Sequence, residues 1–160
     1  MRMTHAILET PTSRPRLDYP TVVPKAIQAM LALSGVAKRG GLDATLLYLV
    51  DIRASQLNGC AFCLDMHIRE AQAAGVGEDR VNLVAAWRDV DIYSERERAA
   101  LQWTELLTQL AGRHVTDDDF AAARAVFSET ELTYLSLAVV AINGWNRLNV
   151  GFRMPPRFGS

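Results

Sequence analysis

The chain has 160 residues, of which 49% are hydrophobic and 22% are charged, and its net charge is −1. Such a length and apolar fraction suit one globular domain or one subunit of an oligomer, and the charge balance gives no electrostatic basis for binding nucleic acid or an anionic membrane. No apolar run is long enough to span a bilayer and no signal peptide is evident, so we expect a cytoplasmic protein with no nucleic-acid or membrane partner.

The first third of the chain predicts an arm and two helices. Residues 1–20 contain three of the six prolines and are expected to form an extended arm without chemistry. Apolar side chains then recur at helical intervals over residues 21–38, and Gly40-Gly41 ends that pattern. Asp43 is a suitable N-cap for a helix over residues 44–57, whose wide apolar arc predicts burial on more than one side.

Helical patterns continue to the end of the domain, and strand signals are almost absent. Five more helices are expected over residues 60–74, over residues 79–87, between Ser94 and Gly112, from Thr116 with Phe120 facing inward, and from Ser128 to residue 151. Ser94 and Ser128 each begin a capping-box pattern. The sequence therefore predicts an all-α, single-domain helical bundle over residues 21–151, followed by an irregular tail over residues 152–160.

The chemistry is expected where the two cysteines of the chain lie close together. Cys60 and Cys63 are three positions apart, and His67 follows four positions later, so a helix would place all three on one face. Gly59 breaks the preceding helix, which puts Cys60 near a helix N-terminus, where the macrodipole favours a thiolate. The spacing also allows the pair to cycle between dithiol and disulfide.

Three other interpretations compete with redox chemistry. Cys60, Cys63 and His67 could bind zinc, but a structural zinc site needs a fourth ligand, and His5 and His114 lie far away in the sequence. Haem attachment requires a histidine directly after the second cysteine, a position that a leucine occupies. The cysteines could also be buried structural residues beside a core histidine. We expect neither a metal nor a cofactor.

Two stretches of the chain resemble a known family. Residues 55–67, SQLNGCAFCLDMH, closely resemble the core motif of the alkylhydroperoxidase D-like proteins, which belong to the carboxymuconolactone decarboxylase superfamily. Residues 142–150, INGWNRLNV, resemble the ending common in that family. The resemblance implies an all-helical subunit that assembles as a homo-oligomer, commonly a trimer or hexamer. It also implies a thiol-dependent peroxidase with a hydroperoxide substrate and a dithiol protein as reductant.

The resemblance also implies roles for individual residues. Cys63 would attack the peroxide, Cys60 would resolve the sulfenic acid as a disulfide, and His67 would belong to the proton relay. The helix dipole instead favours Cys60, at the expected helix N-terminus, as the more acidic thiol. Thiolate stability does not by itself choose the attacking sulfur, because access and nucleophilicity also count.

One position departs from the family pattern. The relay glutamate that usually precedes the first cysteine by twelve residues is replaced by Tyr48. A phenol with an ordinary pKa of about 10 is a poor proton acceptor near neutral pH. Tyr48 is a candidate site residue that could orient His67 or a water, or could simply pack. Asp51, one helical turn further on, is the alternative carboxylate.

The replaced glutamate motivates a second hypothesis of a redox-responsive or structural oligomer without significant peroxidase turnover. Decarboxylation, the reaction of the superfamily's namesakes, is disfavoured because those proteins generally lack the cysteine pair.

Overall fold

The computed structural model describes residues 14–157, so most of the predicted arm, with His5, and residues 158–160 of the predicted tail lie outside it. Within the described residues the fold consists of helices and contains no strand, which confirms the all-α, single-domain prediction. The elements are α1 (Tyr19–Val22), α2 (Pro24–Lys38), α3 (Ala44–Leu57), α4 (Ala61–Ala73), α5 (Glu78–Asn82), the 3-10 helix η1 (Val84–Asp89), α6 (Glu95–Thr108), α7 (Asp117–Val126) and α8 (Glu129–Phe152).

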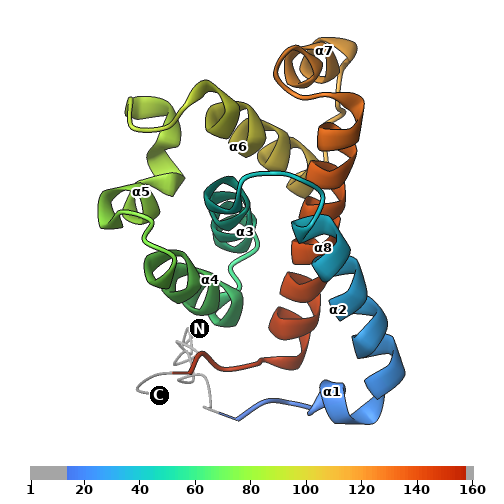
Figure 1. The fold of residues 1–160 in the computed structure, drawn as a ribbon. Coiled ribbons are helices and arrows are strands. Elements are labelled where there is room, and N and C mark those ends of the chain that lie inside the picture. The colour runs from blue at the N-terminus through green and yellow to red at the C-terminus, as the bar shows by residue number, and fades with distance from the viewer. Residues whose placement is uncertain (1–13, 158–160) are drawn as a thin grey trace, which may run out of the picture.

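Helix α3 lies at the centre of the bundle, with α4, α6 and α8 around it (Figure 1). Its apolar residues Leu49, Val50, Ile52 and Ala54 are at most 1% exposed. This confirms the burial predicted from its wide apolar arc. Because α3 is covered on several sides, a polar side chain on it, such as Asp51, is held inside the molecule.

Helix α2 packs along α8 at the edge of the bundle (Figure 1). Trp145 of α8 donates a hydrogen bond from Nε1 to the Ser34 hydroxyl of α2 at 2.9 Å. Of the residues in α2, Ala37 alone is buried, whereas the apolar side chains of Leu31 and Val36 are exposed. The subunit therefore leaves much of the apolar surface of α2 uncovered.

Capping side chains determine where the later helices begin. Ser94 and Ser128 each make both hydrogen bonds of a capping box, with Glu97 and Glu131 respectively, as predicted. Thr116 caps α7 in the same way. These bonds satisfy backbone N–H groups that have no partner within the first turn of a helix.

The predicted helix over residues 79–87 is divided into α5 and η1. Leu83 separates the two elements, and within η1 Ala86 also has non-helical dihedral angles, with φ −111° and ψ 24°. The break turns Trp87 into the core, where it is 5% exposed and bonded to Glu105. The prediction of one continuous helix was wrong because a tertiary contact, not a local glycine or proline, interrupts it.

Two apolar side chains near α6 and α7 are exposed. Helix α6 ends at Thr108 rather than near Gly112, which leaves Leu110 54% exposed in the following loop. Phe120 is 51% exposed, although its ring lies 6.4 Å from that of Trp103. The expectation for Phe120 was wrong because α7 lies at one end of the bundle (Figure 1). Its main contacts there are with α6 and α8, which leave Phe120 exposed.

The described part of the arm is fastened to the end of α8. The Arg16 backbone N–H donates to the Phe152 carbonyl at 2.8 Å, and its Nη1 donates to the Gly151 carbonyl at 3.0 Å. Tyr19 begins the short helix α1, and its buried ring lies 5.2 Å from that of Phe152. The arm is therefore not extended throughout, and it places one aromatic side chain inside the molecule.

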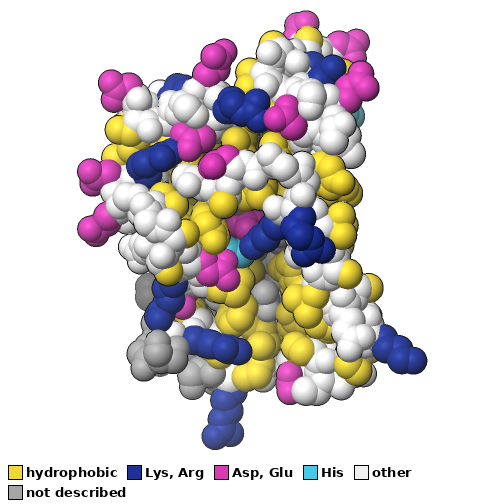
Figure 2. Space-filling view, in the orientation of Figure 1, with side chains coloured by type: hydrophobic (Ala, Val, Ile, Leu, Met, Phe, Trp, Pro, Cys, Tyr) yellow, Lys and Arg dark blue, Asp and Glu magenta, His cyan; other side chains and the backbone are white. Residues whose placement is uncertain are grey.

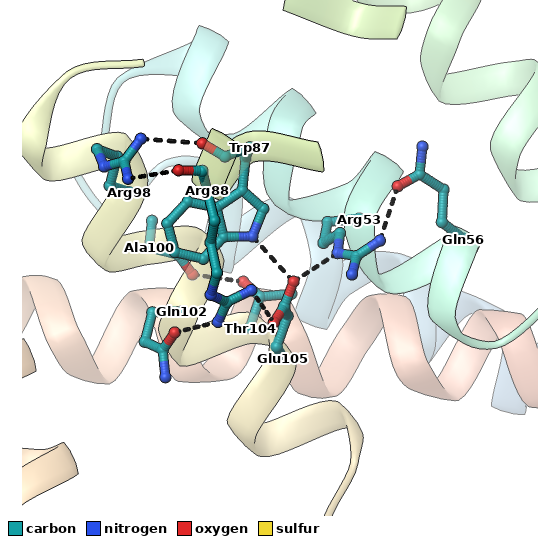
Figure 3. A network of polar contacts seen from close by, with 9 residues as sticks. All are labelled: Arg53, Gln56, Trp87, Arg88, Arg98, Ala100, Gln102, Thr104 and Glu105. Atoms are coloured by element: carbon teal, nitrogen blue, oxygen red, sulfur yellow. Dashed lines mark hydrogen bonds and ion pairs between the residues drawn. The ribbon is translucent and has the colours of Figure 1, made fainter. Parts of the chain in front are cut away.

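A buried carboxylate joins α6 to α3 and η1 (Figure 3). Glu105 accepts hydrogen bonds from Arg53 Nε at 2.7 Å, Trp87 Nε1 at 2.9 Å and Arg88 Nη1 at 2.7 Å. Burial by itself would raise the pKa of Glu105, but the hydrogen bonds from Trp87, Arg88 and Arg53 together lower it. The ionised carboxylate thus fixes the position of the central helix.

Within residues 14–157 no single helix has the length and apolar character needed to cross a membrane. Helices α7 and α8 meet those two criteria only when taken together, and they are bent by 113° relative to each other.

Candidate active site

The turn between α3 and α4 places the two cysteines. Gly59 has φ +64°, a left-handed conformation that glycine adopts at little cost, and the next residue, Cys60, is the N-cap of α4. The Cys60 Sγ accepts a hydrogen bond from the Cys63 backbone N–H at 3.3 Å. The two cysteines form a disulfide, with their Cα atoms 5.4 Å apart. The predicted position of Cys60 at a helix N-terminus is confirmed.

Asparagines of α8 hold this turn in place. Asn58 donates from Nδ2 to Asn143 Oδ1 at 3.0 Å and to Asn146 Oδ1 at 2.9 Å. The fully buried Asn146 in turn donates to the Ser55 hydroxyl at 3.1 Å. The end of α3, and hence the start of the cysteine helix, is thereby tied to α8.

A cavity of about 400 Å³ lies between α2, α4 and α8. Hydrophobic side chains gather in a hollow between these helices (Figure 2). Of the two cysteines, only Cys63 lines the cavity, although Cys60 and Cys63 are each 1% exposed. A molecule that entered the cavity would therefore lie beside Cys63 rather than Cys60. The apolar wall includes Leu31, Ala37, Leu47, Phe62, Ile142 and Trp145.

Titratable side chains from three helices meet in the wall of the same cavity. His67 of α4 is buried, with Nδ1 at 3.0 Å from Glu70 Oε2 and 3.6 Å from Asp51 Oδ2. Lys38, at the end of α2, places Nζ 3.5 Å from that same Asp51 oxygen. The structure therefore places His67 and Cys63 in the lining of one cavity and brings His67 close to a carboxylate of the central helix.

The pKa values of the two carboxyl groups beside His67 are shifted in opposite directions. Burial raises the pKa of Asp51, and the nearby His67 and Lys38 offset this only in part. The hydrogen bond with His67 lowers the pKa of Glu70 against a smaller effect of burial. Asp51 can thus take up a proton at a pH where Glu70 stays ionised.

Tyr48 lies on a different side of α3 from the cavity. Its half-buried ring packs against the apolar cluster that contains Leu49, Ile52 and Val81, and it is not among the residues that line the cavity. Asp51, the alternative carboxylate, lines the cavity and contacts His67.

Four further residues of this site were missed in the sequence. Lys38 and Glu70 contact the Asp51–His67 pair, Asn149 contacts the Cys63 sulfur, and Tyr19 contacts Asn149. The spacing of Asn143, Asn146 and Asn149 by three residues in a largely apolar helix was an available signal, because polar residues on a buried helix face need buried partners.

The residues present offer no assembled metal site in the part of the chain that the structure covers. Within it, no group of three or more His, Cys, Asp and Glu side chains is placed to hold a metal ion. His114, the distant candidate ligand that is described, lies exposed in the loop after α6.

Comparison with known proteins identifies the family. The model of the carboxymuconolactone decarboxylase family matches residues 24–106. The uncharacterized protein YdfG of Bacillus subtilis is 34% identical over 135 residues, which cover 84% of this chain and 92% of YdfG. The chain belongs to the carboxymuconolactone decarboxylase family. A second relative, the uncharacterized protein YnjA of Escherichia coli, is 30% identical over 74% of this chain and 64% of its own length.

Solved structures place this family member among the AhpD-like proteins. A protein of unknown function from Agrobacterium tumefaciens, a candidate AhpD antioxidant defence protein, is 40% identical with a TM-score of 0.86, over 90% of this chain and 99% of its own. An AhpD-core, peroxidase-related protein from Ralstonia eutropha is 20% identical with a TM-score of 0.77, over 90% of this chain and 77% of its own. The second likeness concerns the fold alone.

Proposed function

We propose that this family member is a thiol-dependent peroxidase that reduces organic hydroperoxides through a Cys63–Cys60 dithiol–disulfide cycle. The observation that carries the proposal is the position of Cys63 in the wall of an apolar cavity that also contains the buried His67–Asp51 pair. The AhpD-like fold and the disulfide between the two cysteines support it.

The chemistry begins at the Cys63 sulfur. The Cys63 thiolate attacks the outer oxygen of the hydroperoxide, the O–O bond breaks, and the departing alkoxide takes a proton to become an alcohol. Cys63 is now a sulfenic acid. Cys60 then loses its proton and attacks that sulfur, which forms the disulfide and releases water. We assign the attack to Cys63 rather than to Cys60 because Cys63 is the cysteine that lines the cavity, which supports this order of events.

His67 and Asp51 manage the protons in this proposal. His67 removes the thiol proton and returns a proton to the leaving alkoxide, and Asp51 orients the imidazole and stabilises its charged form. Asp51 Oδ2 lies 3.6 Å from His67 Nδ1 and Glu70 Oε2 lies 3.0 Å from the same nitrogen, so both carboxylates can stabilise the charged imidazole. In this proposal the buried Asp51, which also lines the cavity, takes the place of the missing relay glutamate one helical turn further along α3.

The cavity favours a hydroperoxide with an apolar group over hydrogen peroxide. A volume of about 400 Å³ is within the range of cavities that hold small organic ligands. Apolar walls stabilise an organic group by removing it from water and offer little to hydrogen peroxide itself. A dithiol protein would return the pair to its reduced state, which requires a reducing compartment, and we therefore place the protein in the cytoplasm.

Stopped-flow measurement of thiol oxidation tests the proposal. The reduced protein is expected to react faster with cumene hydroperoxide than with hydrogen peroxide, and His67→Ala is expected to slow the reaction by about 10²-fold. His114→Ala, which removes an exposed histidine, is the matched control and should react at the wild-type rate. Equal rates for His67→Ala and His114→Ala would contradict the relay. Negligible oxidation of the wild type would favour the redox-responsive or structural oligomer instead.

A further inference from the structure

Beyond the cysteine pair and its proton relay, a second set of polar contacts reaches the reacting sulfur from α8 and the N-terminal arm. Asn149, near the end of α8 and 5% exposed, donates from Nδ2 to the Cys63 Sγ at 3.2 Å. Its Oδ1 accepts a hydrogen bond at 2.9 Å from the hydroxyl of Tyr19. Tyr19, Asn149 and Cys63 thus form a continuous buried chain of hydrogen bonds.

We propose that Asn149 is a catalytic residue that stabilises the Cys63 thiolate, and that Tyr19 is a positioning residue that holds the Asn149 amide in the donating orientation. The inference rests on the proposed role of Cys63 as the attacking thiol. It assigns part of the active site to the N-terminal arm, for which the sequence predicted no chemistry.

The direction of the Asn149 amide decides its effect. A side-chain amide has an accepting oxygen at one side and a donating NH₂ at the other. Because the Tyr19 proton occupies the oxygen, the NH₂ group faces the sulfur. Burial raises the pKa of Tyr19, so its phenol keeps the proton that this arrangement requires. The opposite orientation would place the amide oxygen against a negative sulfur.

A donated hydrogen bond strengthens when its acceptor becomes charged. The Asn149 amide therefore favours the Cys63 thiolate over both the thiol and the disulfide. Cys60 receives its hydrogen bond from a different source, the backbone N–H at the start of α4. Each sulfur thus accepts a hydrogen bond from a different donor. The helix dipole is therefore not the only influence on which thiol ionises.

The arm holds Tyr19 firmly enough for this role. Arg16 makes two hydrogen bonds to the backbone at the end of α8, and the Tyr19 ring packs on Phe152. Tyr19 and Pro20 also line the cavity. The arm therefore fixes both the hydroxyl and the aromatic ring at the site.

The test measures the ionisation of Cys63 without any peroxide. In a Cys60→Ser background Cys63 is the only thiol of the chain, and serine is a good N-cap for α4. The pKa of Cys63 is read from the ultraviolet absorbance of its thiolate and from the pH dependence of its alkylation by iodoacetamide. Asn149→Leu is expected to raise that pKa by about one unit or more. Tyr19→Phe is expected to raise it by less.

Tyr93→Phe is the matched control, because it removes another buried tyrosine hydroxyl, one that bonds to the Arg80 carbonyl away from the cavity. If the pKa of Cys63 is the same in the Asn149→Leu, Tyr19→Phe and Tyr93→Phe proteins, the proposal is overturned. If Asn149→Leu does not fold, Tyr19→Phe alone decides between these outcomes. Since no peroxide is used, this result is independent of whether the protein is a peroxidase.

Discussion

Asp51 is a carboxyl group buried on the central helix, and its pKa is raised by burial despite the opposing effects of His67 and Lys38 and with a further rise from Glu70. A carboxyl pKa that is higher in the folded than in the unfolded protein means that ionisation destabilises the fold. The contribution of Asp51 to stability is fully present below its ordinary pKa near 3.8. That contribution is lost as the pH rises through the higher pKa that Asp51 has in the folded protein. The group that we place in the relay is therefore held at a cost in stability, as is common at active sites.

Asp51→Asn is expected to separate these two effects. The substitution removes the buried charge, so the melting temperature should rise at neutral and alkaline pH by about 3 °C per kcal/mol gained. No gain is expected below about pH 4, where both proteins carry a neutral side chain. Thiol oxidation by cumene hydroperoxide should fall by about tenfold or more. Scanning calorimetry against pH and stopped-flow rates provide the two measurements.

Asp65→Asn is the control, because Asp65 pairs with Arg69 on the outer part of the same helix as the cysteines. If the thiols of the Asp51→Asn protein oxidise as fast as those of the control, Asp51 does not take part in the relay. Tyr48→Phe in the same assay should cause a smaller loss than Asp51→Asn. A larger loss in Tyr48→Phe would indicate that the relay uses residue 48, the position of the family glutamate.

For individual residues, the sequence predicted the three reactive side chains that share one face of a helix, although it missed Glu70 on the same helix. Cys60, Cys63 and His67 could be placed because the helical repeat alone determines their spacing. Lys38 and Asn149 could not, because they reach the site from α2 and α8, and their approach depends on how those helices pack. Asp51 was found only as an alternative, since the sequence does not show which side of a buried helix faces a cavity.

Among the elements, the position of α3 depends on the buried carboxylate of Glu105 (Figure 3). Because hydrogen bonds lower its pKa below the ordinary value near 4.5, its contribution to stability is fully present above that value. The contribution is lost as the pH falls through the lower pKa of the folded state. Acid should therefore loosen the contact between α6 and the helices that hold the site.

Glu105→Gln is expected to lower the free energy of unfolding by about 2–3 kcal/mol at neutral pH, because Arg53 and Arg88 lose their charged acceptor. Urea denaturation at several pH values provides the measurement. The difference from wild type should shrink as the pH falls below the ordinary pKa near 4.5 and through the lowered pKa of the folded carboxylate, which then takes up its proton. Glu95→Gln, at the exposed start of the same helix, should change little, and an equal loss in both variants would contradict the account.

The positions of the helices could be predicted from the sequence. The points where tertiary contacts interrupt or end a helix could not. Ser94 and Ser128 marked helix starts because a capping box is a local arrangement that the sequence displays directly. The break at Ala86 has no such local signal, because it serves to place Trp87 against Glu105. Phe120 was misplaced for a related reason, since α7 lies where few other helices can cover it.

For the whole molecule, the uncovered apolar face of α2 supports the proposal that copies of this chain associate. Val22, Val23, Leu31 and Val36 are exposed large apolar residues on α1, α2 and the bend between them. Contiguous exposed apolar side chains are typical of contacts between subunits. We expect a homo-oligomer, a trimer or hexamer, in which this surface is covered by a second copy.

Light scattering after size-exclusion chromatography tests this expectation. The mass should be a multiple of the 17.7 kDa chain, and Val36→Glu should shift it toward the monomer by placing a charge in the contact. Lys25→Glu, which changes an exposed and already charged position of α2, should leave the mass unchanged. A monomeric wild type would contradict the proposal.

The central claim is that the Cys63 sulfur attacks a hydroperoxide and that Cys60 then closes the disulfide. The most direct measurement is mass spectrometry of the reduced protein after one equivalent of cumene hydroperoxide, with dimedone present to trap a sulfenic acid. The wild type is expected to lose two hydrogens per subunit, Cys60→Ser to carry dimedone on Cys63, and Cys63→Ser to remain unmodified. Unchanged thiols in the wild type, or a dimedone adduct on Cys60 in the Cys63→Ser protein, would contradict the account.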